Sequence, residues 1–307
     1  KPDMEAAMAA LMSLPADAEW SDQAQIAGVV VRLRRRAEGD IVQARAMVDE
    51  LCDRLATVEP STHRGDIVRL ALRVCHEEGR AVEGPGIVVR ASHALQEHEH
   101  LVLLARAHLL AGAREQGIEI ASAAAGMIRE GASWFDLRAA AELAQECGLY
   151  SDAVRLWQVL LPRNYAGSDT EQLVRAAYYA REWRTVLDVC KNVRAAGRIT
   201  RRHLEIEVDV LAASREVGRA IELLSEWVAV HPKDKLACLH LSTLALYEAK
   251  PHLAVFDESR LPSVSELAHP SQGAALIYVL RRGPAPERSL EIAYNLYRRF
   301  PEHADSQ

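Results

Sequence analysis

Aromatic residues and glycines are scarce in this chain of 307 residues. Phe, Trp and Tyr together make up 5% of it, and only 16 residues are Gly. Alternating Val/Ile/Thr stretches joined by Asn-Gly turns, the pattern of hairpin sheets, are nearly absent. Runs of Ala, Leu, Arg and Glu, which are good helix formers, fill most of the sequence instead. This balance predicts an all-α fold.

Long hydrophobic runs and paired cysteines are also missing. No stretch approaches 18 consecutive apolar residues, so we expect no membrane span. The five cysteines are odd in number, and none belongs to a Cys-x-x-Cys motif. We therefore expect buried free thiols and a reducing, cytoplasmic location. The sequence begins at Lys1 with neither an initiator Met nor a signal-peptide pattern, and we expect it to be a fragment of a longer protein.

Catalytic signatures are lacking as well. The sequence contains no GxGxxG, GxxxxGK[ST], GxSxG or HExxH motif. His93, His98, His100 and His108 lie close together, but a helix would point His98 and His100 to different faces. No pair of carboxylates stands in an isolating context. We therefore predict a protein that is not an enzyme, with no catalytic residues, no metal site and no cofactor.

A repeat with a period near 34 residues organises the sequence. Its clearest unit runs from Trp134 to Tyr165, where two helical patterns flank the turn Gly148-Leu149-Tyr150. A small residue recurs near the start of the second pattern, at intervals of 33, 36, 33, 34, 34 and 35 residues. Val186 is the one larger residue in this series. The recurring positions are Gly84, Gly117, Ala153, Val186, Ala220, Ala254 and Ser289.

This unit resembles the tetratricopeptide repeat, whose signature is W-x2-L-G-x2-Y, then A-x3-F, then P. Small residues let two antiparallel helices approach closely, and Gly148 permits the left-handed conformation that ends the first helix. Trp stands where the signature has Phe. The matching residues are Leu137, Ala140, Ala141, Ala144, Ala153 and Trp157.

The resemblance covers roughly Gly65 to His303 and implies a right-handed α-α superhelix of antiparallel helix pairs. We expect residues 61–307 to form the repeat array. Residues 1–60 keep a helical pattern without the recurring small residue, and we expect a helical cap or degenerate repeats there, because a terminal repeat must be shielded from solvent.

Two places depart from the pattern. The turn Ala180-Arg-Glu-Trp183 contains no glycine, and the second helix after Ala254 is weakly encoded. The Pro- and Ser-containing segment from Leu261 to Pro270 predicts a loop with one short turn.

In tetratricopeptide arrays the first helix of each pair lines the concave surface. Applied here, that rule places a recurring set of Arg on the inner wall, followed by two Tyr. Guanidinium forks beside aromatic rings suit an acidic or carboxylate-bearing peptide. The alternative is that these Arg pair with groove acids such as Glu142 and Glu171, or are solvated. The predicted partner-binding residues are Arg69, Arg73, Arg106, Arg138, Arg175, Tyr178 and Tyr179.

The later repeats place a different chemistry on the same wall. Their predicted inward positions are Glu205, Asp209, Leu239, His240, Thr243 and Tyr247.

The net charge of −6, with 37 basic and 43 acidic residues interspersed, disfavours a general nucleic-acid binder. We predict a non-catalytic scaffold that binds a peptide or partner protein in its groove, with an acidic peptide as one candidate. The alternative is a regulatory or docking region of a larger multidomain enzyme or regulator, whose groove contacts a neighbouring domain. RNA binding through the Arg-lined first half is the least favoured of the three.

Overall fold

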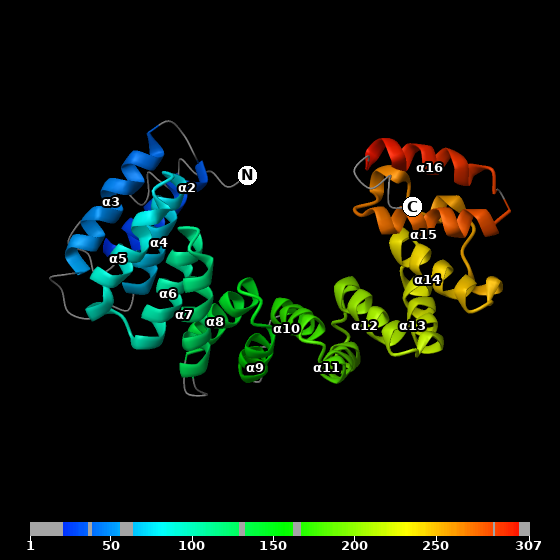
Figure 1. Ribbon diagram of the computed structural model, residues 1–307, viewed down its shortest axis with the longest axis horizontal. Helices are drawn as coiled ribbons and strands as arrows, with labels where there is room; N and C mark the ends of the chain where they lie inside the picture. Colours follow the sequence, from blue (N-terminus) through cyan, green and yellow to red (C-terminus); the bar gives the residue numbers. More distant parts are fainter. Residues whose placement is uncertain are drawn as a thin grey trace. The chain divides into compact units, whose positions relative to one another are not determined.

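The computed structural model shows a chain of helices, drawn in Figure 1. All regular structure in its described residues is helical, which confirms the all-α fold. The chain divides into two compact units, residues 1–180 and 181–307, and each is described by itself. The structure describes residues 21–35, 39–55, 64–128, 133–161, 167–284 and 286–300.

The first unit consists of consecutive helix pairs. Within it, α2 packs against α3, α6 against α7, and α8 against α9, as the repeat predicts. Two 3-10 turns, η1 (Ala81–Glu83) and η2 (Ser92–Ala94), flank α5. The helices are α2 (Ser21–Arg35), α3 (Asp40–Leu55), α4 (Arg64–Glu77), α5 (Gly84–Arg90), α6 (Glu97–Leu110), α7 (Arg114–Met127), α8 (Trp134–Glu146), α9 (Tyr150–Leu160) and α10 (Gly167–Tyr179).

The second unit repeats the arrangement, with α12 packed on α13 and α15 on α16. Its helices are α11 (Trp183–Ala195), α12 (Arg201–Ala213), α13 (Val217–Val230), α14 (Lys235–Tyr247), α15 (Pro270–Arg282) and α16 (Arg288–Arg299). Every helix in the described part of the chain is too short or too polar to cross a lipid bilayer.

One expected second helix is absent from this unit. Ala254 has extended backbone, with φ −74° and ψ 139°. Ser242 holds this segment against α14, because its hydroxyl accepts from the Val255 amide at 2.8 Å and donates to the Val255 carbonyl at 3.2 Å. Three 3-10 turns replace the helix: η3 (Pro251–Leu253), η4 (Glu258–Arg260) and η5 (Val264–Glu266).

The expected N-terminal cap is described in part. Residues 1–20, 36–38 and 56–63 lie outside the described residues. The described part forms the α2–α3 pair, whose Val29, Leu33 and Val48 are buried in one core with residues of α4. The division at residue 60 stays a prediction.

The recurring small residues lie at close helix crossings. Ala153 and Ala220 are fully buried, and Ser289 is 4% exposed. A Cβ at Gly117 would lie 2.7 Å from Cδ2 of Leu109, which is closer than packed side chains allow. These contacts confirm that the period marks the packing of second helices on first helices.

The turns that end the first helices share one geometry. At each turn one residue has a positive φ, and the next amide bonds back to a carbonyl in the last turn of the helix, as Leu149 does to Ala144 at 2.8 Å and Glu216 to Leu211 at 2.8 Å. Only half of these left-handed residues are glycines, so sequence punctuation marks half of the turns. They are Gly79, Gly112, Gly148, Arg181, Arg215 and Ala249.

All five cysteines are free thiols; Cys52 is half-buried and the other four are buried. Burial raises the pKa of the Cys190 thiol to about 12. The expectation of free thiols is confirmed.

The left-handed Arg215 yields a stability prediction. Arg215→Gly should raise the free energy of unfolding by about 0.5–1 kcal/mol, because glycine adopts a positive φ without the steric cost of a Cβ. Arg215→Ala is the matched control, since it removes the charge but keeps the Cβ. Urea unfolding of both variants measures the difference; equal stabilities would contradict the turn geometry.

The buried Ala153 yields a second prediction. Ala153→Leu should cost about 1–3 kcal/mol, because the crossing of α8 and α9 has no room for the added atoms. Ala123→Leu, at an exposed position of α7, serves as the control and should change the melting temperature little. An unchanged melting temperature for the Ala153 variant would show that the helix register is wrong.

Candidate functional site

The first helices α4, α6, α8 and α10 carry all seven predicted binding residues. The helices α4 and α6 lie in contact, and so do α6 and α8, so their polar sides form one surface of the first unit. We call this surface the first-helix face. The five Arg do not share one role on it.

Three of these Arg bind acids of the next first helix. Arg69 of α4 lies 3.4 Å from Glu99 of α6, and Arg106 of α6 lies 3.2 Å from Glu146 of α8. Arg138 of α8 repeats this contact with an acid of α10. We call these contacts the forward ion pairs. They tie neighbouring repeats together.

The pair between Arg138 and Asp169 is the most buried of the three. The Asp169 side chain is 1% exposed and pairs directly with the Arg138 guanidinium. Arg138 also lies 3.2 Å from the Ser168 hydroxyl and 3.7 Å from Glu142, a pair anticipated from the sequence. Because it compensates a buried charge, Arg138 has a structural role whether or not a partner binds.

Burial also affects the acids of this face. It raises the pKa of Glu99, opposed by Arg69, and it raises the pKa of Glu142, opposed by Arg138. Both guanidinium groups therefore help to keep these carboxylates charged.

Arg73 of α4 and Arg175 of α10 differ from the other three. Both are exposed, and neither makes an ion pair or hydrogen bond within the part of the chain that the structure describes. Their guanidinium groups are free to receive a ligand.

The predicted tyrosines gather where α10 ends. The Tyr179 ring stacks on Tyr150, the first residue of α9, with 5.0 Å between ring centroids, and meets Tyr178 edge-on at 5.6 Å. Tyr179 is 52% exposed. Tyr179 therefore lies one helical turn from Arg175, beside the turn that joins α8 to α9.

In the second unit the first helices α12, α14 and α15 enclose a pocket of about 440 Å³. Five of the six inward positions expected from the sequence line it, whereas Tyr247 is 74% exposed and lies outside the lining. Sequence reasoning missed the wall from α15, because the broken second helix hides where the next repeat begins. The lining residues are Glu205, Asp209, Leu236, Leu239, His240, Thr243, Ser271, Gln272 and Ala275.

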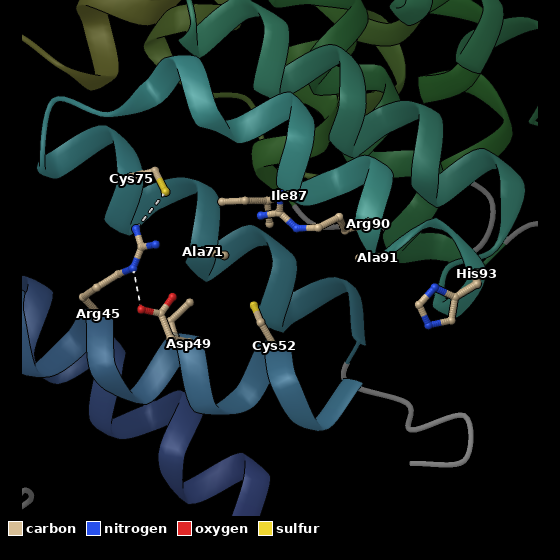
Figure 2. A pocket seen from close by; sticks show the side chains of 10 residues that line it. Arg45, Asp49, Cys52, Ala71, Cys75, Ile87, Arg90, Ala91 and His93 are labelled. Carbon is tan, nitrogen blue, oxygen red and sulfur yellow. Dashed lines mark hydrogen bonds and ion pairs between the residues drawn. The ribbon is translucent and has the colours of Figure 1, made fainter. Parts of the chain in front are cut away.

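A cavity of about 500 Å³ in the first unit lies among α3, α4 and α5, and Figure 2 shows its lining. Inside it, Arg45 donates to Asp49 at 2.8 Å and to the Cys75 sulfur at 3.4 Å, and it lies 3.3 Å from Glu78. Burial raises the pKa of Cys75, which disfavours a reactive thiolate. The buried cation of this cavity is thus already matched within the protein.

His93, His98, His100 and His108 do not assemble into a ligand set. Among the described residues no group of three His, Cys, Asp or Glu side chains is placed to hold a metal ion.

Solved structures with similar backbones include two helical assemblies. One is a tetratricopeptide repeat protein from Parabacteroides merdae ATCC 43184, with 10% identity and a TM-score of 0.47, covering 79% of this chain and 94% of that one. The other is the APC/C hetero-tetramer Cut9-Hcn1, with 11% identity and a TM-score of 0.34, covering 96% of this chain and 59% of that one. No family model matches the chain, and no curated protein matches it. The helical-repeat architecture stands on the helix pairs and turns of this chain itself.

The forward ion pairs predict unequal effects for two Arg of the same face. Arg138→Met should lower the free energy of unfolding by about 2–3 kcal/mol, because it leaves the buried Asp169 carboxylate without its cation. Arg175→Met, the matched control, should change it by less than about 0.5 kcal/mol, because Arg175 is exposed and makes no ion pair with the described residues. Urea unfolding measures both; equal losses would contradict the assignment.

Proposed function

We propose that this chain is a non-catalytic scaffold whose first-helix faces bind a partner polypeptide. The observation that carries the proposal is the division among the Arg of the first unit. Three serve the forward ion pairs, whereas Arg73 and Arg175 remain exposed without a partner among the described residues. Exposed Arg beside an exposed Tyr is the composition that dominates interface hot spots.

The chemistry of this face supports an acidic segment of the partner. Guanidinium groups bind carboxylates with two parallel hydrogen bonds, and Tyr179 adds an aromatic surface that orders at low entropic cost. The same face carries Glu142 and Glu146, both half-exposed, which would repel the continuous phosphates of an RNA strand. A peptide with separated acidic side chains fits this mixture better.

The second candidate is a docking region that binds a neighbouring domain of the same longer protein. The same exposed Arg and Tyr would then contact that domain. Cross-linking of the full-length protein distinguishes the two. Links from the first-helix face to another part of the same molecule favour docking, and links to a different protein favour the scaffold.

Charge reversal at the two unpaired Arg tests the proposed site. The double variant Arg73→Glu/Arg175→Glu should reduce capture of partners from an extract of the source organism at least about fivefold, since the fold does not depend on these residues. Arg138 is left intact because its loss would destabilise the protein by itself.

The matched control is Arg114→Glu/Arg184→Glu, which makes the same change in charge on the second helices α7 and α11. Arg114 is exposed and the Arg184 side chain is 97% exposed. Capture should survive in this control. Equal capture by both double variants would place the binding surface elsewhere.

A further inference from the structure

The pocket among α12, α14 and α15 carries negative charge that the protein does not balance. Glu205 is compensated, because Arg201 lies 2.9 Å from it. The one ionic partner that the described residues offer Asp209 is His240, at 4.0 Å. Burial lowers the pKa of His240, so the imidazole is neutral at pH 7 and supplies no charge.

The carboxylate of Asp209 is placed at some cost. Its side chain is half-exposed, yet partial burial raises its pKa, opposed weakly by His240. The raised pKa means that the surroundings disfavour the charged form of Asp209. A cation bound beside this carboxylate would offset that penalty.

The rest of the pocket is apolar or neutral. Leu239 is 3% exposed and forms the floor, with the half-buried Leu236 and Ala275 beside it. The wall from α15 brings Ser271 and Gln272 and no charged side chain. A volume of about 440 Å³ lies within the range of about 300–1,000 Å³ typical of ligand pockets.

An acidic rim over an apolar floor matches a side chain with a cationic head and an aliphatic stem. We propose that this pocket binds one basic side chain, Arg or Lys, of the partner polypeptide, with the head at Asp209 and the stem on Leu239 and Ala275. The inference rests on the proposed function and names the chemistry of one contact within it. It adds a basic residue to a partner for which the first unit indicates acidic ones.

Nuclear magnetic resonance titration of the whole chain with N-acetyl-arginine-N-methylamide tests the proposal. Saturable shifts are expected at Asp209, Thr243 and the side-chain amide of Gln272. The neutral analogue N-acetyl-norleucine-N-methylamide should bind at least about fivefold more weakly, since it lacks the charged contact. Bound cation should also lower the pKa of His240 further, because Glu205 and Asp209 are the only acids that line the pocket and the head displaces any proton from the imidazole.

Three variants sharpen the test. Asp209→Asn should abolish the preference for arginine over norleucine. Gln272→Glu should strengthen arginine binding about two- to fivefold, because a carboxylate at this position retains the helix cap that Gln272 now provides to Ala268 and His269. Glu222→Gln, an exposed position on α13, is the matched control and should leave binding unchanged.

The proposal is overturned if the arginine analogue shifts no pocket resonance, if norleucine binds equally well, if the corresponding glutamate analogue binds more tightly, or if neither Asp209→Asn nor Gln272→Glu alters the preference. Failure here is distinct from failure of the proposed function. A partner captured through Arg73 and Arg175 while the pocket ignores arginine overturns this inference alone. A pocket that binds arginine in a chain that captures no partner overturns the scaffold alone.

Discussion

The chain must reverse direction within about three residues at the end of each first helix, and the packing of every pair depends on that turn. A left-handed residue makes the reversal, and the residue packed at the helix crossing follows five positions later, as Ala153 follows Gly148 and Ala220 follows Arg215. The constant offset means that one backbone conformation sets where the second helix meets the first. Ala249 makes the same turn, but Ser242 then holds the chain extended instead of allowing a second helix.

Contacts between repeats rely on a second device. In a chain with 5% aromatic residues, Arg side chains long enough to reach the next first helix join α4 to α6, α6 to α8 and α8 to α10. Exposed pairs of this kind contribute little each, but the pair that covers Asp169 compensates a buried charge and is costly to break. Much of the Arg on this face is therefore committed to the fold before any partner arrives.

The sequence predicts the period, the helix pairs and the residues of the first-helix face, because these follow from local periodicity and the recurring small residue. It does not distinguish Arg138 from Arg175, which have the same residue type and the same expected orientation. The difference lies in an acid 31 residues away, Asp169, whose burial depends on how two repeats pack. The wall of the second pocket from α15 escapes prediction for a related reason, since three 3-10 turns shift where the next first helix begins.

The charges left over after internal pairing bear on the kind of partner more than the composition does. The first unit leaves Arg73 and Arg175 without partners among the described residues, and the second leaves Asp209 facing a neutral imidazole. An RNA strand could satisfy the first set but would meet repulsion at the second. A polypeptide can present carboxylates to one unit and a basic side chain to the other, whatever the relative placement of the two units. Opposite residual charges on the two units therefore favour a protein partner over a nucleic acid, a conclusion that the net charge of −6 alone does not provide.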